Sequence, residues 1–155
     1  MQTRPDTDMP PIAALGVQLG ILSQLYAGLM TRLLDPHGLT YPQFTLLMHL
    51  TRRTEPCRIS DVSSAVDLTQ SAVTKAVQKF QKMGWVEVLR DSADQRNRPI
   101  RVTGAGRAHV GAILKDFGPA FSRMLDGWDE ADITRLTGDV GRLAAWLDAE
   151  RRRDR

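Results

Sequence analysis

The sequence predicts a mainly α-helical protein with one small β-hairpin, and three observations support this fold class. Apolar residues recur at alternating spacings of three and four near both ends of the chain, a pattern typical of long helices that pack on other helices. Shorter stretches with helical apolar spacing lie between those ends. One pair of short β-branched segments, separated by a polar loop, predicts the hairpin.

The composition is that of a soluble globular protein. The 155 residues are enough for one domain with its own core, and 42% of them are apolar. The one cysteine, Cys57, excludes an internal disulfide framework and fits a reducing compartment. The N-terminus lacks the apolar segment of a signal peptide, and no run approaches the roughly 20 apolar residues that span a bilayer. We therefore expect a cytoplasmic protein with no membrane segment.

Positive charge is concentrated in the middle of the chain. The net charge is +3, whereas residues 58–107 contain nine Lys or Arg against five Asp or Glu, which gives this segment a net charge of +4. The remainder of the chain is close to neutral. This distribution permits nucleic acid as a partner without requiring it.

Long helices are expected at both ends of the chain, after a flexible tail at residues 1–11. The first helix covers residues 12–35 and ends where Pro36 and Gly38 form a turn. The second region, residues 104–150, contains Gly118-Pro119, which predicts a kink. Thr103 should cap its first helix, and Asp129 or Asp132 should begin its last. Its apolar stripe and that of the first helix exceed what one small domain can bury, which predicts a homodimer.

The stretch Asp67–Met83 has one apolar face and one polar face. Thr69 suits an N-cap, because its hydroxyl can accept a hydrogen bond from a free N–H of the first turn. The apolar face consists of Val73, Val77, Phe80 and Met83. The other face carries Gln70, Ser71, Thr74, Lys75, Gln78, Lys79 and Lys82, and no acidic residue. Such a helix suits the major groove of DNA, where its first side chains reach base edges and its lysines meet phosphates.

Two shorter helices are expected before this stretch. Thr40 can cap the first of them, which carries an apolar stripe that includes Phe44 and Met48. Ser60 can cap the second, with Val62 and Ala65 facing inward. Because a tight turn at Asp67-Leu68 joins the second helix to the basic one, the pair predicts a helix-turn-helix.

A hairpin with a basic tip follows directly. Gly84 should end the basic helix, and Trp85–Arg90 and Ile100–Val102 should form two strands around the loop Asp91–Pro99. Arginines at the tip, Arg96 and Arg98, suit the minor groove, whose narrow A·T stretches concentrate negative potential. Residues 40–103 therefore predict a winged helix-turn-helix domain between long terminal helices.

Three segments, in this order, carry a family resemblance over essentially the whole chain. They are GLTYPQFTLLMHL at 38–50, RISDVSSAVDLTQSAVTKAVQKFQKMGWVEV at 58–88, and DQRNRPIRVTGAGR at 94–107. The last contains Asp-x-Arg, a short strand and Thr-x-x-Gly. Together they resemble the second helix, the helix-turn-helix and the wing of MarR-family transcriptional regulators. The sequence departs from the family in a loop before Asp94 that is a residue or two shorter, and in Val102, where leucine is common.

The resemblance implies a dimer that binds a pseudo-palindromic operator in double-stranded DNA, most often as a repressor that a small phenolic or carboxylate ligand releases. It places major-groove contacts on the first turns of the basic helix, phosphate contacts at Ser60 and Lys79, and a minor-groove arginine at Arg96, which Asp94 would orient. The complete DNA-binding set is Ser60, Thr69, Gln70, Ser71, Thr74, Lys75, Lys79, Asp94, Arg96 and Arg98.

The resemblance also places a ligand site between the dimerisation helices and the winged domain. Candidate residues are Tyr26, Tyr41, Phe44, Met48, Arg53 and Ile113. Arg53 could pair with a carboxylate, while the simpler interpretation of the apolar members is an ordinary core, because helical stripes usually are core.

Other functions find less support in the sequence. No nucleophile elbow, phosphate-binding glycine loop or His-Glu metal motif occurs, so we expect neither an enzyme, nor a cofactor, nor a metal site. Metal sensing by His49 and His109 is weaker than the interpretation of ordinary packed histidines. Cys57 could sense oxidants, but only Arg58 beside it would lower its pKa. A winged-helix dimer that binds protein rather than DNA is the remaining alternative.

Overall fold

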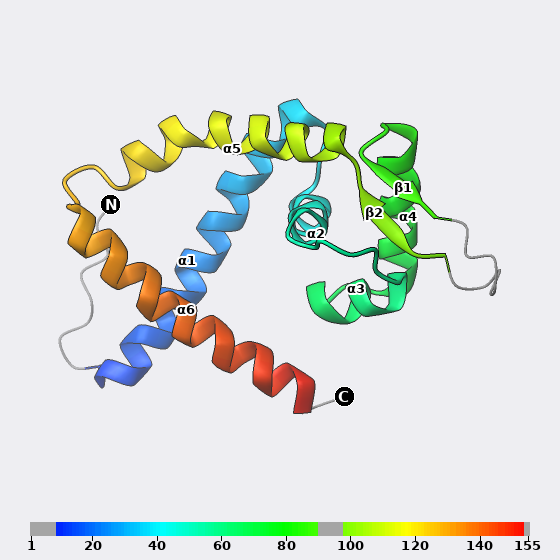
Figure 1. The fold of residues 1–155 in the computed structure, drawn as a ribbon. Helices are drawn as coiled ribbons and strands as arrows, with labels where there is room; N and C mark the ends of the chain where they lie inside the picture. The colour runs from blue at the N-terminus through cyan, green and yellow to red at the C-terminus, as the bar shows by residue number, and fades with distance from the viewer. Residues whose placement is uncertain (1–8, 90–97, 154–155) are drawn as a thin grey trace. The chain divides into compact units, whose positions relative to one another are not determined.

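The computed structural model describes residues 9–89 and 98–153. Its elements are α1 (Pro11–Leu34), the 3₁₀ turn η1 (Asp35–His37), α2 (Tyr41–Thr51), α3 (Ile59–Val66), α4 (Gln70–Lys82), β1 (Val86–Val88), β2 (Ile100–Val102), α5 (Gly104–Met124) and α6 (Glu130–Arg153) (Figure 1). The chain forms two compact units, Met1–Phe117 and Gly118–Arg155. Helices with a single antiparallel hairpin confirm the predicted fold class.

The first helix is more exposed and more apolar than the sequence led us to expect. Only Met30 and Leu34 of α1 are buried, whereas Ile12 is 87% exposed and Leu25 is 68% exposed. Residues 9–31 include no charged side chain, and Pro11–His37 is long and apolar enough to cross a membrane by length and composition. The expectation that no run approaches this length is therefore wrong. By itself this is weak evidence for a membrane span, because helices that pack against protein have the same composition.

Local capping signals were predicted well. Thr40 caps α2 through a capping box, in which its hydroxyl accepts from the Gln43 N–H and the Gln43 side chain accepts from the Thr40 N–H. Thr103 accepts from the Gly106 N–H at 3.1 Å at the start of α5. Asp129 accepts from the Asp132 N–H at 2.7 Å and so begins α6.

The helix-turn-helix differs from prediction in three details. The N-cap of α3 is Arg58 rather than Ser60, because the helix already begins at Ile59 and Ser60 Oγ instead contacts Asp61. Ala65 is exposed, while Ser63 is buried and donates to the Leu68 carbonyl at 2.6 Å. Met83 is 55% exposed, because it is the C-cap of α4 and lies beyond its last helical turn.

α4, the hairpin and α5 are held together by close backbone packing around Trp85, which we call the joint. After α4, Gly84 has a φ of 72°, as predicted for the residue that ends this helix. Thr103 donates its N–H to the Trp85 carbonyl at 2.9 Å and its hydroxyl to the Gly84 carbonyl at 2.7 Å. A Cβ on Gly106 would lie 2.2 Å from the Trp85 carbonyl oxygen. Only glycine therefore allows α5 to approach this closely.

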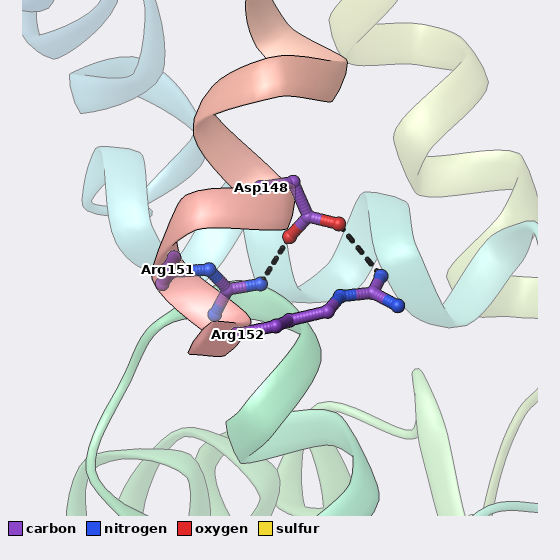
Figure 2. Close-up of polar contacts among 3 residues, drawn as sticks. All are labelled: Asp148, Arg151 and Arg152. Carbon is purple, nitrogen blue, oxygen red and sulfur yellow. Dashed lines mark hydrogen bonds and ion pairs between the residues drawn. The ribbon is translucent and has the colours of Figure 1, made fainter. Parts of the chain in front are cut away.

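The second unit contains α6, whose surface carries several ion pairs between residues three or four positions apart. Asp148 binds two arginines of the last turn, Arg151 at 2.5 Å and Arg152 at 2.6 Å (Figure 2). The hydrogen bonds from these arginines lower the pKa of Asp148. The helix continues to Arg153, three residues beyond its predicted end. Arginines in the last turn also complement the negative end of the helix dipole, although each exposed pair contributes little.

Gly106→Ala tests the joint. The added methyl group would meet the Trp85 carbonyl and Val102, so we expect a loss of about 1–3 kcal/mol in the free energy of unfolding. Urea denaturation measures this loss. Gly111→Ala on the same helix is the control, because a Cβ there meets nothing within 4 Å and should leave stability unchanged or higher by about 0.4–1 kcal/mol. Equal effects of the two substitutions would contradict the tight packing.

Candidate nucleic-acid interface

The recognition helix α4 is built by its cap and its buried face. Thr69 Oγ1 accepts a hydrogen bond from the Ala72 N–H at 3.1 Å, which confirms the predicted N-cap. Val73 and Phe80 are fully buried and Val77 is 2% exposed, so one face of the helix belongs to the core. This burial orients the remaining face toward solvent.

The outward face of α4 carries polar and basic groups at its first turns. Gln70, Ser71 and Lys75 are exposed, and Thr74 is half-buried with its hydroxyl donating to the Gln70 carbonyl at 2.8 Å. The sequence of α4 contains no Asp or Glu. Amide, hydroxyl and ammonium groups are those that read base edges and phosphates, so this face has suitable chemistry for a major groove.

Two residues expected at phosphates have partners within the protein. The Lys79 ammonium donates to the Gly38 carbonyl at 2.5 Å and to Gln43 Oε1 at 3.0 Å. Gln43 is also the residue of the α2 capping box whose side chain accepts from the Thr40 N–H. Ser60 Oγ lies 3.4 Å from Asp61 Oδ1 and is exposed. Lys79 thus ties the recognition helix to the turn between α1 and α2.

The hairpin follows α4 closely, as Figure 1 shows for β1 and β2. Its strands pair Glu87 opposite Arg101, and these side chains form an ion pair at 2.8 Å. Arg98 is exposed just before β2. The predicted wing residues Asp94 and Arg96 lie outside the described residues. The strand predicted at Trp85–Arg90 is shorter, covering Val86–Val88.

The ligand candidates separate into core residues and a second group of half-buried tyrosines and an exposed arginine. Ile113 is fully buried and Phe44 is 7% exposed, with the Phe44 ring packed edge-on against Phe117 at 5.5 Å between centroids. Met48 is half-buried. These positions fit the interpretation that the apolar candidates form core.

Tyr26 and Tyr41 do come together, with ring centroids 6.0 Å apart. Burial, followed by the nearby Tyr41, raises the pKa of Tyr26, so its phenol stays protonated. Arg53 is exposed and donates from Nε to His49 Nε2 at 3.4 Å. The tyrosine pair is the part of the predicted set that could present hydroxyl groups to a ligand.

Cys57 has the environment of a structural thiol. It is 7% exposed and forms a β-bridge with Ile100, whose N–H donates to the Cys57 carbonyl at 2.8 Å. Burial raises the pKa of the thiol, although Arg53 acts in the opposite direction. A thiol with a raised pKa is a poor nucleophile, which weighs against oxidant sensing.

The histidines are arranged differently from the suggested pair. His109 lies beside His37, with ring centroids 5.8 Å apart, and its ring stacks on Trp85 at 4.0 Å. His37 Nε2 is 3.3 Å from Asp116 Oδ2. Across the described parts of the chain, no group of three or more His, Cys, Asp or Glu could hold a metal ion. Sequence reasoning missed this cluster; its one signal was the seven-residue spacing of His109 and Asp116, which puts both on one helix face.

The sequence model of the MarR family matches residues 37–97, which run from the end of η1 through α2, α3, α4 and β1 into the hairpin loop. Over this segment the chain is similar to the MarR family. Its relatives include the transcriptional regulator PecS of Dickeya dadantii, which is 25% identical over 146 residues, covering 93% of this chain and 87% of PecS. MarR-family proteins of this kind are transcriptional regulators rather than enzymes.

Two further proteins extend the comparison. The transcriptional repressor IacR of Pseudomonas putida is 28% identical over 111 residues, covering 72% of this chain and 66% of IacR. The crystal structure of CouR from Rhodococcus jostii RHA1 bound to p-coumaroyl-CoA aligns with a TM-score of 0.67 and 21% identity, covering 84% of this chain and 91% of CouR. The structural likeness shows that this chain shares the fold of CouR.

The cap of the recognition helix gives a direct test. Thr69→Ala removes the hydroxyl that satisfies the Ala72 N–H, so we expect a loss of about 1 kcal/mol in the free energy of unfolding. Urea unfolding followed by far-UV circular dichroism measures it. Thr69→Ser keeps the acceptor and should stay within about 0.5 kcal/mol of the wild type; a loss as large as that of Thr69→Ala would show that the hydroxyl bond is not the cause.

Proposed function

We propose that this protein is a ligand-responsive repressor of the MarR family that binds a pseudo-palindromic operator as a homodimer. The observation that carries the proposal is the exposed, acid-free face of α4, which stands directly before a hairpin with a basic side chain at its base. The repressor IacR is among the relatives of the chain, which supports repression as the output.

Side chains of the first two turns of α4 would recognise the base sequence of the operator. Gln70 can pair bidentately with adenine, and Ser71 and Thr74 can bond to several bases. Lys75 is exposed on the same face and would neutralise a phosphate or contact guanine. Arg98 before β2 and Arg96 of the loop would contact the adjacent minor groove, and Asp94 would orient Arg96 by a hydrogen bond. Thr69 would keep the start of α4 in place as its N-cap. Ser60 would lie near the phosphate backbone of the DNA.

A homodimer would bury the apolar surface that a single chain leaves in water. Along α1, Leu15, Leu22 and Leu25 are exposed at 49%, 55% and 68%. Along α6, Val140 and Leu147 are exposed at 47% and 62%. Full burial of such side chains stabilises by roughly 1.5–3 kcal/mol each, so dimerisation through these stripes is favourable. A symmetric dimer would present two recognition helices to two half-sites.

The ligand class is proposed from chemistry and from one relative. CouR was crystallised with p-coumaroyl-CoA, whose acyl group is phenolic. In this chain the Tyr26–Tyr41 pair could donate to a phenol or carboxylate, and Met48 would offer an apolar wall. Arg53 could pair with a carboxylate, while Phe44 and Ile113 would support the site from the core.

Salt-dependent DNA binding tests the central proposal. Fluorescence anisotropy on duplex DNA from the region upstream of its gene, between about 50 and 200 mM salt, should show tight binding that weakens steeply as salt rises. Lys75→Gln should reduce the slope of log Kd against log salt by about 0.9, because one phosphate contact is lost. Lys79→Gln should weaken binding with the slope unchanged, because the Lys79 ammonium is bonded to Gly38 and Gln43.

Lys115 is exposed on α5, so Lys115→Gln is the matched charge control. It should change neither Kd nor the slope of log Kd against log salt. Adding p-coumarate to the same assay should raise Kd if the ligand proposal holds. Failure to bind any duplex at low salt would end the repressor proposal and leave a protein-binding winged helix. The buried Cys57 gives no support to the redox alternative.

The dimer proposal has its own test. Leu22→Glu places a charge in the exposed apolar stripe of α1, so we expect a dimeric wild type and a variant whose dissociation constant is at least about tenfold higher. Sedimentation equilibrium measures both. Gln24→Glu adds the same charge off the stripe and should leave the dimer intact. A wild type that sediments as a monomer would contradict the proposal.

A further inference from the structure

We propose that the cluster of His37, Trp85 and His109 positions the recognition helix and releases it when His109 takes up a proton, so that DNA binding weakens in mild acid. This inference rests on the proposed DNA-binding function. The cluster joins three parts of the first unit that are far apart in sequence: the turn η1, the residue after Gly84, and the first turns of α5.

The rings are packed in direct contact. The His109 imidazole lies over the Trp85 indole with 4.0 Å between centroids and 15° between planes, so the two rings are stacked. On its other side it meets the His37 ring edge-on at 5.8 Å. Trp85 is only 8% exposed. His109 therefore contacts both other rings of the cluster, one by stacking and one edge-on.

The cluster is connected to α4 at two points. Trp85 follows the helix directly, and its N–H donates to the Phe80 carbonyl at 2.9 Å. Gly38, which follows His37, accepts the hydrogen bond from Lys79 of α4 at 2.5 Å. Trp85 is thus joined to α4 by one hydrogen bond, and His37 through its neighbour Gly38 and the hydrogen bond from Lys79. A change in the distance between η1, α5 and Trp85 must move α4.

The environment of His109 suits a neutral ring. Its Nε2 is buried and, among the described residues, has no hydrogen-bond partner. An imidazolium would place an N–H there with no acceptor, at a cost in free energy. Stacking on the indole face favours an imidazolium through a cation–π attraction. Burial of the ring, followed by the neighbouring His37, acts in the opposite direction and lowers the pKa of His109.

The groups that face His109 also oppose a second charge. From η1 it faces His37, and from its own helix Asp116 lies beyond His37, with 3.3 Å between Asp116 Oδ2 and His37 Nε2. On α4, the Lys79 ammonium is held on the Gly38 carbonyl. Burial, and then the charge of His37, lower the pKa of His109. Asp116 compensates His37 rather than His109, so protonation of both histidines leaves adjacent positive charges.

The pH window follows from the direction of this shift. An unconstrained histidine has a pKa of about 6.5, and the packed His109 has a lower one. The stabilising contribution of the stack is therefore complete above about pH 6.5 and is lost as the pH falls through the lowered pKa of His109. Each unit of difference between the two pKa values corresponds to a tenfold bias toward the opened arrangement.

The experiment compares the wild-type protein with His109→Phe at pH 7.5, 6.5 and 5.5 and constant ionic strength. Phenylalanine keeps a ring on Trp85 but cannot bind a proton. From pH 7.5 to 5.5 we expect the wild-type Kd for upstream duplex DNA to rise about tenfold and that of the variant by less than about threefold. Thermal unfolding without DNA should show the same contrast, with Tm falling more in the wild type.

Two controls make the outcome decisive. His49→Gln removes the other histidine whose pKa is lowered by burial, followed by Arg53 and Arg52, and should keep the full pH response. If His109→Phe does not fold, His109→Gln supplies a side chain that does not titrate. Equal pH responses of wild type and the His109 variant in both assays would overturn the inference. Should no DNA bind at any pH, the repressor proposal fails, and the Tm comparison alone still decides the role of His109.

Discussion

The close approach of α5 to the backbone of Trp85 is the contact on which the rest of the winged helix-turn-helix depends. Gly106 removes the side chain that would block it, and Thr103 fixes it with hydrogen bonds to the carbonyls of Gly84 and Trp85. Because Gly84 ends α4 and Thr103 follows β2, one small joint sets the directions of the recognition helix, the hairpin and α5 together. A rearrangement of α5 therefore reaches α4 without passing through a flexible linker.

The basic residues of this unit serve two different purposes, which their number alone does not reveal. Lys79, Arg101 and Arg107 are bonded within the protein: Lys79 to Gly38, Arg101 to Glu87, and Arg107 to the carbonyls at the end of α2. Lys75, by contrast, is exposed on the outward face of α4. The first group holds the elements in place, so fewer cations are available to DNA than the local surplus of charge suggests.

The sequence by itself determined the fold class, the order of the elements and the capped starts of α2, α4 and α5. Thr40, Thr69 and Thr103 were recognised as caps because a cap bonds to an N–H only three residues away, so the whole interaction lies within a short stretch of sequence. The buried face of α4 was found for a related reason, since helical spacing places its apolar side chains on one side wherever the helix packs. The family resemblance depended on the same local patterns.

The tertiary structure alone decided which long-range partners those elements have. Lys79 bonds to Gly38, 41 residues earlier. His109 stacks on Trp85 and meets His37 edge-on, and no spacing rule brings these three residues together. Cys57 is buried by its bridge to Ile100, which settles its chemistry as that of a packed thiol. The physical reason is the same in each case: the free energy of these contacts depends on how separate elements pack, and one-dimensional periodicity specifies a face of an element but not its neighbour.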